Sequence, residues 1–407
     1  MTFSKSYFSI FAIGFIIWIT SGNPLSTVPG NPNYYLLIPA LFVLYFHIKK
    51  RSTVRKKNIA LYSYLLLVFL TLSSFLLNLN VSHFSTNVKF LLVITFSYLF
   101  CLTVPFEKFS KYYIQVLKAF SIISIIGYII LNLTSLKISL PVFSNANGVE
   151  YYNGFIFFAI KSFQVYGNSG INRNIGPFWE PGLFATFILL GIILELWKKE
   201  KTSIFTILIF IIALLTTKST FGYLMFIPIG LEIISKTLGE KLALLSTLLS
   251  LVVIAFLSYN LDAIISWLVT MNSEIFSKLI EESNSVNERL EAPLTNIKIF
   301  FDNYLYGAGL GNTEELFDSI TNVPQTSTST FFLATFGFLG LSYTLLLIYG
   351  ILSFKEVRLF SRFIFLTVVF VQINKEPHIY FTTTFILFFY FLLNANTNKP
   401  YSNPKYN

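Results

Sequence analysis

Residues 172–182 read Asn-Arg-Asn-Ile-Gly-Pro-Phe-Trp-Glu-Pro-Gly, and an apolar run from Leu183 to Trp197 follows directly. This stretch places Arg173 and Glu180 at the mouth of a membrane helix, where a charge without a task is costly. Pro181 suits the first turn of a helix because the N–H that it lacks would have no partner there. We therefore predict a helix that begins near Glu180 and presents its amide-rich, positive end to water, where it favours an anionic group.

The composition excludes a set of soluble domains. Of the 407 residues, 54% are hydrophobic, 18% are aromatic and only 12% are charged, and the mean hydropathy is +0.67. These values indicate a polytopic protein surrounded by membrane lipids. The net charge of +10 would suggest a nucleic-acid partner in a soluble protein. Here the lysines and arginines gather in short connections between apolar runs, so membrane topology explains the charge and no nucleic acid is expected.

Cysteine and histidine do not support a metal centre. Cys101 is the single cysteine and lies inside an apolar run, and His47, His83 and His378 are far apart in the sequence. This pattern offers neither a disulfide framework nor a ligand spacing. No metal site and no cofactor are predicted.

We predict an all-α membrane protein with about twelve transmembrane helices and two long extracytoplasmic loops. In chain order its divisions are spans one to five (1–133), the first long loop (134–181), spans six to nine (182–259), the second long loop (260–329), spans ten to twelve (330–393) and a polar cytoplasmic tail (394–407). The fifth span is expected over Tyr113–Leu133 and the tenth over Thr330–Leu352.

The distribution of positive charge predicts the orientation of the chain. Most of the 29 lysines and arginines lie in one alternating set of short connections. Cytoplasmic loops carry such an excess, so both termini are predicted to be cytoplasmic and both long loops to face outward. In the second long loop, Leu261–Ile280 puts Trp267 and its apolar residues on one helical face, which predicts a helix on the membrane surface. In the first, the aromatic segment Tyr151–Tyr166 is either extended or interfacial.

Arg173 and Arg289 are the two arginines predicted to lie outside. One interpretation is structural, in which each guanidinium tethers its loop through backbone carbonyls or a lipid phosphate. The other is functional, since guanidinium is a planar fork that binds phosphate oxygens in pairs and suits a diphosphate at the bilayer surface. The placement of one arginine in each long loop favours the functional reading.

Glu180 also has two interpretations. It is either an N-terminal helix cap that pairs with Arg173, or a carboxylate that takes a proton from a sugar hydroxyl. The remaining acids predicted to lie outside are expected to be mostly solvated: Glu150, Glu281, Glu282, Glu288, Glu291, Asp302, Glu314, Glu315 and Asp318.

Two further features are candidates for contact with an anion. Lys218 lies in a polar turn at the outer membrane edge, where a lysine also reaches lipid headgroups for purely structural reasons. The turn that contains Gly307, Gly309 and Gly311 lacks the Lys-Ser/Thr pair of a nucleotide-binding loop, so a plain loop before a helix is favoured. The amides of Gly309 and Gly311 would be its contribution to an anion site.

These residues resemble the O-antigen and capsular polysaccharide polymerases of the Wzy type, in the superfamily that includes the O-antigen ligases. The resemblance is carried by 173–185, by the turn 217–223, and by Arg289 together with 306–312 and 336–340. Topology and loop placement extend it from about Gly154 to Leu352, whereas the first five spans match only as generic membrane helices.

The resemblance implies a GT-C-like membrane fold and a metal-independent, inverting glycosyltransferase at the outer face of the bacterial inner membrane. Its substrates would be oligosaccharide repeat units on undecaprenyl diphosphate, and a chain-length regulator and a flippase would be its partners. Arg173 and Arg289 match the family's essential outer arginines, and Glu180 matches the Glu-Pro of the polymerases. Arg173, Arg289 and Glu180 are thus the expected catalytic residues, with Lys218, Gly309 and Gly311 as further contacts to the diphosphate.

Two alternatives stay open. Ligases carry a His-Asn pair before the tenth span, where this chain has Thr326-Ser327-Thr328-Ser329, and the difference favours a polymerase. A lipid-linked oligosaccharide flippase or another transporter would keep its ionisable residues within its spans and its loops short. The concentration of charge in two long loops favours an enzyme.

Overall fold

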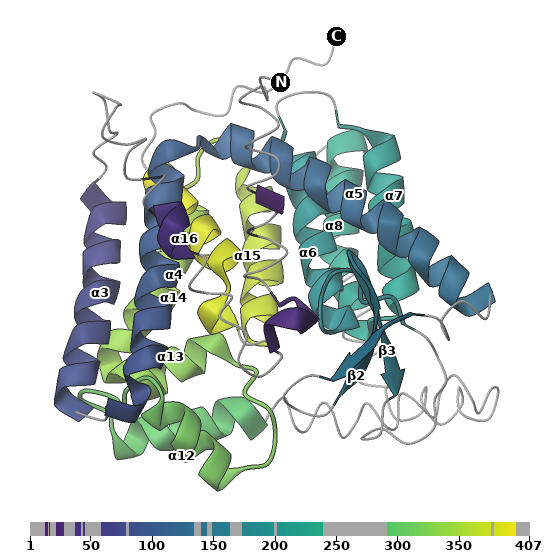
Figure 1. The fold of residues 1–407 in the computed structure, drawn as a ribbon. Helices are drawn as coiled ribbons and strands as arrows, with labels where there is room; N and C mark the ends of the chain where they lie inside the picture. The colour runs from purple at the N-terminus through teal and green to yellow at the C-terminus, as the bar shows by residue number, and fades with distance from the viewer. Residues whose placement is uncertain are drawn as a thin grey trace, which may run out of the picture.

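The computed structural model describes residues 13–14, 16, 22–27, 37–41, 44, 58–78, 81–133, 140–144, 149–162, 173–198, 202–238, 291–375 and 378–395. Arg289, the surface helix expected over Leu261–Ile280, the ninth span and most of the first two spans lie outside these residues. The described chain is mostly helical (Figure 1).

In the part of the chain that the structure describes, four helical stretches are long and apolar enough to cross a membrane: Ile59–Asn78, Phe84–Thr103, Phe106–Asn132 and Thr328–Leu352. The first three correspond to α3 (Asn58–Asn78), α4 (Phe84–Thr103) and α5 (Phe106–Leu133). The fifth predicted span therefore begins a full two turns earlier than expected. Residues 106–112 continue its helix because Phe109 and Tyr113, four residues apart, are buried on one face while Lys108 and Lys111 are exposed.

The other apolar helices are shorter. They are α6 (Pro181–Leu196), α7 (Ile204–Thr217), α8 (Thr220–Leu238), α15 (Leu359–Ile373) and α16 (Thr382–Asn394). Every residue of α6 is buried, and α5, α7 and α8 pack around it. A helix that is apolar on all sides is stable only when it is enclosed in this way. The stretch 172–182 therefore leads into an interior helix of the bundle.

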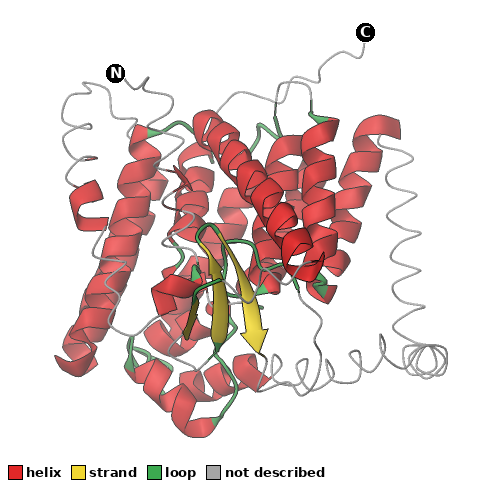
Figure 2. Cartoon of the chain, turned by 45° about the vertical axis from the view of Figure 1, so that its right-hand side comes forward, coloured by secondary structure: helices red, strands yellow, loops and turns green. Residues whose placement is uncertain are grey.

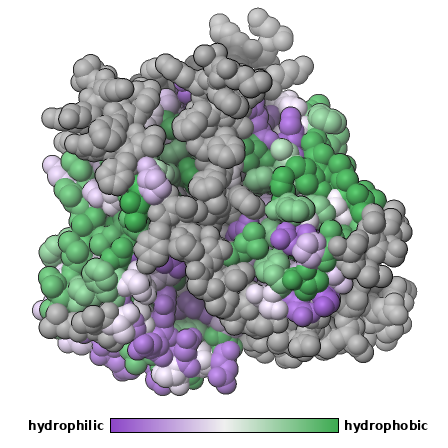
Figure 3. Space-filling model, in the orientation of Figure 1, coloured by the Kyte–Doolittle hydropathy of each residue, from purple (hydrophilic) through white to green (hydrophobic). Residues whose placement is uncertain are grey.

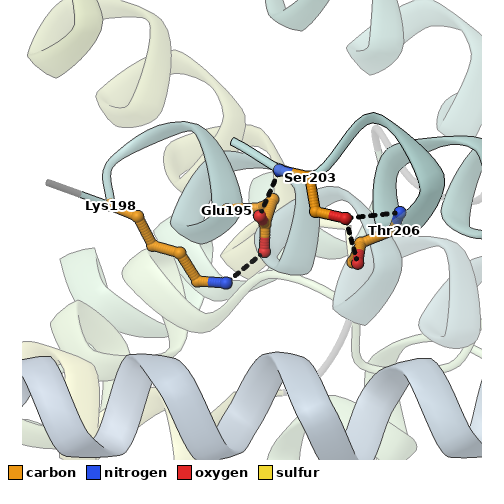
Figure 4. A network of polar contacts seen from close by, with 4 residues as sticks. All are labelled: Glu195, Lys198, Ser203 and Thr206. Carbon is orange, nitrogen blue, oxygen red and sulfur yellow. Dashed lines mark hydrogen bonds and ion pairs between the residues drawn. The ribbon is translucent and has the colours of Figure 1, made fainter. Parts of the chain in front are cut away.

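A polar network joins the far end of α6 to α7 (Figure 4). Glu195, in the last turn of α6, receives Lys198 Nζ at 2.6 Å on Oε2 and the Ser203 amide at 2.9 Å on Oε1. Ser203 in turn caps α7, because its Oγ accepts from the Thr206 amide. Glu195 is fully buried, and these two donors satisfy its carboxylate. This carboxylate within a predicted span is thus explained by a structural task.

The tenth predicted span is broken into two helices. It consists of α13 (Thr328–Phe336), the 3₁₀ turn η5 (Gly337–Gly340) and α14 (Leu341–Leu352). Gly337 has φ +63°, and a Cβ at Gly340 would lie 1.9 Å from the Phe332 carbonyl oxygen. Only glycine fits this close approach of two backbones. The span expected over Thr330–Leu352 therefore matches the apolar stretch Thr328–Leu352, which consists of a short helix, a glycine turn and a second helix.

The expectation of an all-α protein is also corrected. The first long loop contains a three-stranded antiparallel sheet of β1 (Val142–Ser144), β2 (Glu150–Gly154) and β3 (Phe157–Ser162), in that order. Of the two forms considered for Tyr151–Tyr166, its described part is extended. The strands form because alternate aromatic side chains share one face: the rings of Phe143 and Tyr151 stack with centroids 5.5 Å apart, over a cluster that includes Phe158.

The sheet and α12 (Asn312–Ile320) lie at the same end of the helical bundle, the lower end in Figure 1, and the rotated view in Figure 2 agrees. The described parts of both long loops therefore share one end of the molecule. Which side of a membrane this end faces remains a prediction.

Candidate functional site

Arg173 begins the loop 173–180, which connects the sheet region to α6, and its guanidinium binds the end of α7. Nε donates to the Thr217 carbonyl at 3.2 Å and Nη2 to the Lys218 carbonyl at 2.7 Å. The last carbonyls of a helix lack partners within the helix and carry partial negative charge, so a cation is favourable there. These two contacts fit the structural interpretation of Arg173, in which it tethers its loop through backbone carbonyls.

Asn174 holds the same helix end, a role that its position in the sequence does not predict. Its amide donates to the Thr216 carbonyl at 3.0 Å, and its Nδ2 donates to Thr216 Oγ1 at 2.8 Å. Its Oδ1 accepts from the Gly176 amide at 3.0 Å, which closes a tight turn where Gly176 has φ +55°. The buried Asn174 and the neighbouring Arg173 therefore fix the loop 173–180 before α6 begins.

The predicted start of α6 is confirmed. Glu180 is the N-cap residue, with φ −148° and ψ 157°, and Pro181 occupies the first helical position. The Glu180 side chain makes no capping hydrogen bond, although its carbonyl accepts from the Phe184 amide at 3.3 Å. The cap is therefore a backbone feature, and the half-buried carboxylate of Glu180 does not serve as the side-chain cap considered from sequence.

Lys218 is brought to the same place as Arg173. It ends α7 in a left-handed conformation with φ +49°, its side chain is exposed, and its carbonyl is the one bound by Arg173 Nη2. Two of the predicted diphosphate contacts thus share one turn at the end of the bundle. Arg289 lies outside the described residues, so its distance from them is not tested.

The glycine turn 307–311 precedes α12, and its glycines pack closely against neighbouring parts of the chain. The Gly309 amide donates to the Thr335 carbonyl at 3.0 Å, and a Cβ on Gly309 would lie 2.7 Å from Asn78 Nδ2. A Cβ on Gly311 would lie 2.3 Å from the His83 ring. These glycines allow α12 to approach α3, η3 (Val81–His83) and α13 closely. The Gly309 amide is engaged in this contact and is not a donor for an anion.

A titratable cluster next to this turn was missed. The Tyr380 hydroxyl donates to Glu314 Oε1 at 2.9 Å, and Lys89 Nζ lies 4.0 Å from the centre of the Tyr380 ring. Burial raises the pKa of the Glu314 carboxyl above its ordinary value, against the opposing effects of the Tyr380 hydrogen bond and the Lys89 charge. Glu314 had been grouped with the solvated acids. Its position three residues before the buried Phe317, on the inner side of α12, is the signal that could have found it.

A short segment links this cluster to the loop 173–180. The segment 378–381 consists of the 3₁₀ turn η6 (His378–Tyr380) and Phe381, the N-cap residue of α16. The Phe381 ring lies 5.6 Å from the ring of Trp179, next to Glu180, while Tyr380 binds Glu314. The loop 173–180 and helix α12 therefore contact adjacent residues of one segment.

Among the residues that the structure describes, no group of three His, Cys, Asp or Glu side chains could hold a metal ion. The candidate groups at this end include the cations Arg173 and Lys218 near α7 and the Glu314 carboxylate with its tyrosine and lysine neighbours.

Comparison with known proteins adds no name. No family model matches this chain, and no curated protein sequence matches it. A function is therefore inferred from the residues and their arrangement.

Proposed function

We propose that this chain is a multi-pass membrane glycosyltransferase that joins lipid-diphosphate-linked oligosaccharide repeat units into a polysaccharide. The observation that carries the proposal is the gathering of Arg173, Lys218, Glu180 and Glu314 at one end of an apolar helical bundle. The resemblance to the Wzy-type O-antigen and capsular polymerases supplies the substrate class, undecaprenyl-diphosphate-linked oligosaccharides. The proposed site of action is the outer face of the bacterial inner membrane, with both termini cytoplasmic.

The reaction has two requirements, and this end of the molecule has side chains of the chemical type that each one needs. Negative charge develops on the leaving diphosphate, and cationic donors held in place beforehand stabilise it most where water is scarce. Arg173 and Arg289 have this task in the proposal, with the exposed Lys218 beside Arg173. The acceptor hydroxyl must lose its proton as it attacks the opposite face of the anomeric carbon, which calls for a carboxylate such as Glu180. Two N–H groups of Arg173 hold carbonyls, and in the proposal its positive charge acts on the diphosphate.

The position of the ionisable groups favours an enzyme over a flippase. A transporter is expected to place ionisable residues near the bilayer midplane. The buried carboxylates within the described helices of α6 and α8 are Glu195 and Glu232, and each has a structural partner: Glu195 binds Lys198 and Ser203, and Glu232 accepts from Ser361. Both lie toward the end opposite the sheet.

One observation favours the O-antigen ligase alternative. Ligases carry histidine before the tenth span, and here the His378 amide donates to Thr328 Oγ1 at 2.9 Å. His378, from the segment before α16, therefore lies next to the start of the tenth span, where the ligases carry their histidine. Replacing His378 by Ala separates the two candidates, because a ligase would lose transfer to its acceptor whereas the polymerase proposed here would keep its chain length.

The experiment that tests the proposed function is deletion of the gene in its host, followed by electrophoresis of the surface glycan. A polymerase predicts loss of long chains while single repeat units are still exported. Accumulation of repeat units at the inner face would indicate a flippase, and an unchanged distribution of chain lengths would refute a polymerase. Complementation with Arg173→Ala and Glu180→Gln then tests the assigned residues, with membrane expression measured in parallel.

A further inference from the structure

Helix α12 presents one carboxylate to the interior of the site and others to solvent. Thr313 and Phe317 are buried on its inner face, and Glu314 is half-buried beside them, whereas Glu315 and Asp318 are exposed. Figure 3 shows hydrophilic side chains gathered over this end of the molecule, beside a recess that leads toward its middle. Glu314 thus lies at the boundary between the packed bundle and the polar surface.

The neighbours of Glu314 come from three other parts of the chain. Tyr380, in η6, donates to Oε1. Lys89, in the second turn of α4, lies against the Tyr380 ring and attracts the carboxylate, and His83, in η3, adds a weaker attraction when it is protonated. Asp318, one turn along α12, opposes ionisation. Within the described part of the chain, Tyr380 is the one hydrogen-bond donor to this carboxylate, so Oε2 is not engaged.

This arrangement has the features of a general base. Partial burial makes a carboxylate more basic than one in water, because desolvation disfavours the charged form. The Tyr380 hydrogen bond and the Lys89 charge act in the other direction and keep the group ionisable. A tyrosine on one oxygen also fixes the direction in which the other oxygen points. Glu315, on the same helix, is a different case. Its side chain is 66% exposed, and its ionic contact is with His83.

We propose that Glu314, rather than Glu180, is the catalytic base that accepts the proton of the acceptor sugar hydroxyl. This inference rests on the function proposed above. The hydroxyl oxygen forms a bond to the anomeric carbon of the donor sugar while the bond from that carbon to the diphosphate oxygen breaks, and the electron pair of that bond leaves with the diphosphate. The hydroxyl proton moves to Glu314 Oε2 and is then released to water, which restores the carboxylate. Glu180 keeps its place at the start of α6.

The test uses the full-length protein in liposomes and the lipid-linked repeat units that the deletion host accumulates. Glu314→Gln retains an oxygen that can accept from Tyr380 but has no basic carboxylate, so its rate of polymerisation should fall at least about a hundredfold. Glu315→Gln is the matched control on the adjacent residue and should polymerise at the rate of the unmodified protein. Thermal unfolding of each variant shows whether the fold is retained.

The pH profile separates a base from a structural contact. The rate should fall on the acid side as Glu314 becomes protonated, and this acid limb should vanish from the residual activity of Glu314→Gln. Lys89→Met keeps the carboxylate and removes an attraction that favours its ionised form, so the acid limb should move to higher pH. An unmoved limb in Lys89→Met, or a Glu314→Gln rate within about threefold of the unmodified protein, would overturn the assignment. If gene deletion abolishes long chains while Glu314→Gln restores them, the proposed function stands and this inference alone fails.

Discussion

The Tyr380 hydroxyl donates a hydrogen bond of 2.9 Å to Glu314 Oε1 and so joins α12 to the segment that precedes α16. The two residues are 66 positions apart in the sequence. Their contact brings a carboxylate from the second long loop against the start of the last described helix. It also places Glu314 close to Lys89, whose ammonium lies against the same tyrosine ring.

Tyr380→Phe should shift the titration of Glu314 upward. The hydroxyl stabilises the ionised carboxylate, so its removal raises the pKa of Glu314 further above the ordinary value. The acid limb of the rate profile should move to higher pH, and stability should fall by about 1 kcal/mol for the lost hydrogen bond. Rates measured across pH in liposomes check the first expectation. Tyr306→Phe, at an exposed position in the second long loop that also contains Glu314, is the control and should leave the limb unchanged.

Glu314→Gln should change how stability depends on pH. A carboxyl whose pKa is raised in the folded state binds its proton more tightly there than in the unfolded chain. Its contribution to stability is therefore fully present below the unfolded pKa and is lost as the pH rises through the folded pKa. Glutamine stays neutral at every pH. The stability of the Glu314→Gln variant should therefore rise relative to that of the unmodified protein as the pH is raised from acid to neutral. Melting temperatures in detergent at several pH values test this, and a Glu314→Gln melting temperature that falls relative to that of the unmodified protein as the pH rises would contradict it.

A comparison of Arg173→Ala with Asn174→Ala should distinguish the structural role of Arg173, which tethers the end of α7, from the proposed role of its positive charge in catalysis. Both residues bind the end of α7, and each substitution should cost about 1 to 3 kcal/mol in stability. If Arg173 also stabilises the leaving diphosphate, Arg173→Ala loses polymerisation far beyond its loss of folded protein, whereas Asn174→Ala loses the two in proportion. Glycan chain length normalised to folded protein gives the comparison. Proportional losses in both variants would leave Arg173 with the structural task alone.

Arg173→Lys extends that comparison. Lysine keeps the positive charge but does not have the planar fork that reaches two carbonyls at once. We expect it to restore little of the tether and, in the proposed function, little of the activity. Full recovery of chain length by Arg173→Lys would show that a single positive charge is sufficient at this position.

Gly340→Ala should disrupt the break between α13 and α14. The added Cβ would lie 1.9 Å from the Phe332 carbonyl oxygen, and the three nearest atoms are all backbone, which leaves little room to relax. We expect a loss of about 1 to 3 kcal/mol, seen as a lower melting temperature and lower expression. Gly230→Ala is the matched control within α8, where a Cβ meets nothing within 4 Å, and it should be neutral or stabilise by about 0.5 to 1 kcal/mol. Equal losses in both variants would argue against the packing explanation.

Several elements could be predicted from local sequence because local physics decides them. The start of α6 follows from Pro181, since proline suits the first turn of a helix, where the N–H that it lacks would have no partner. The bounds of α3 match the apolar run Ile59–Asn78 because hydrophobic length sets the length of a membrane helix. The strands were only half predicted: aromatic alternation was visible in 151–162, but it did not decide between extended and interfacial structure until β1 supplied a partner.

The sequence by itself determined that the chain is apolar enough for a membrane, where α6 begins, and which charged residues fall in its connections. The tertiary structure decided what those charges touch. Arg173 binds carbonyls 44 and 45 residues further along the chain, and Glu314 meets a lysine from α4 and a tyrosine from η6. Helical periodicity reports which side of a helix is apolar, but it carries no information about which distant helix end will lie beside it. The choice between a solvated acid and a half-buried base is set by those distant neighbours, and so it could be made only once the chain had folded.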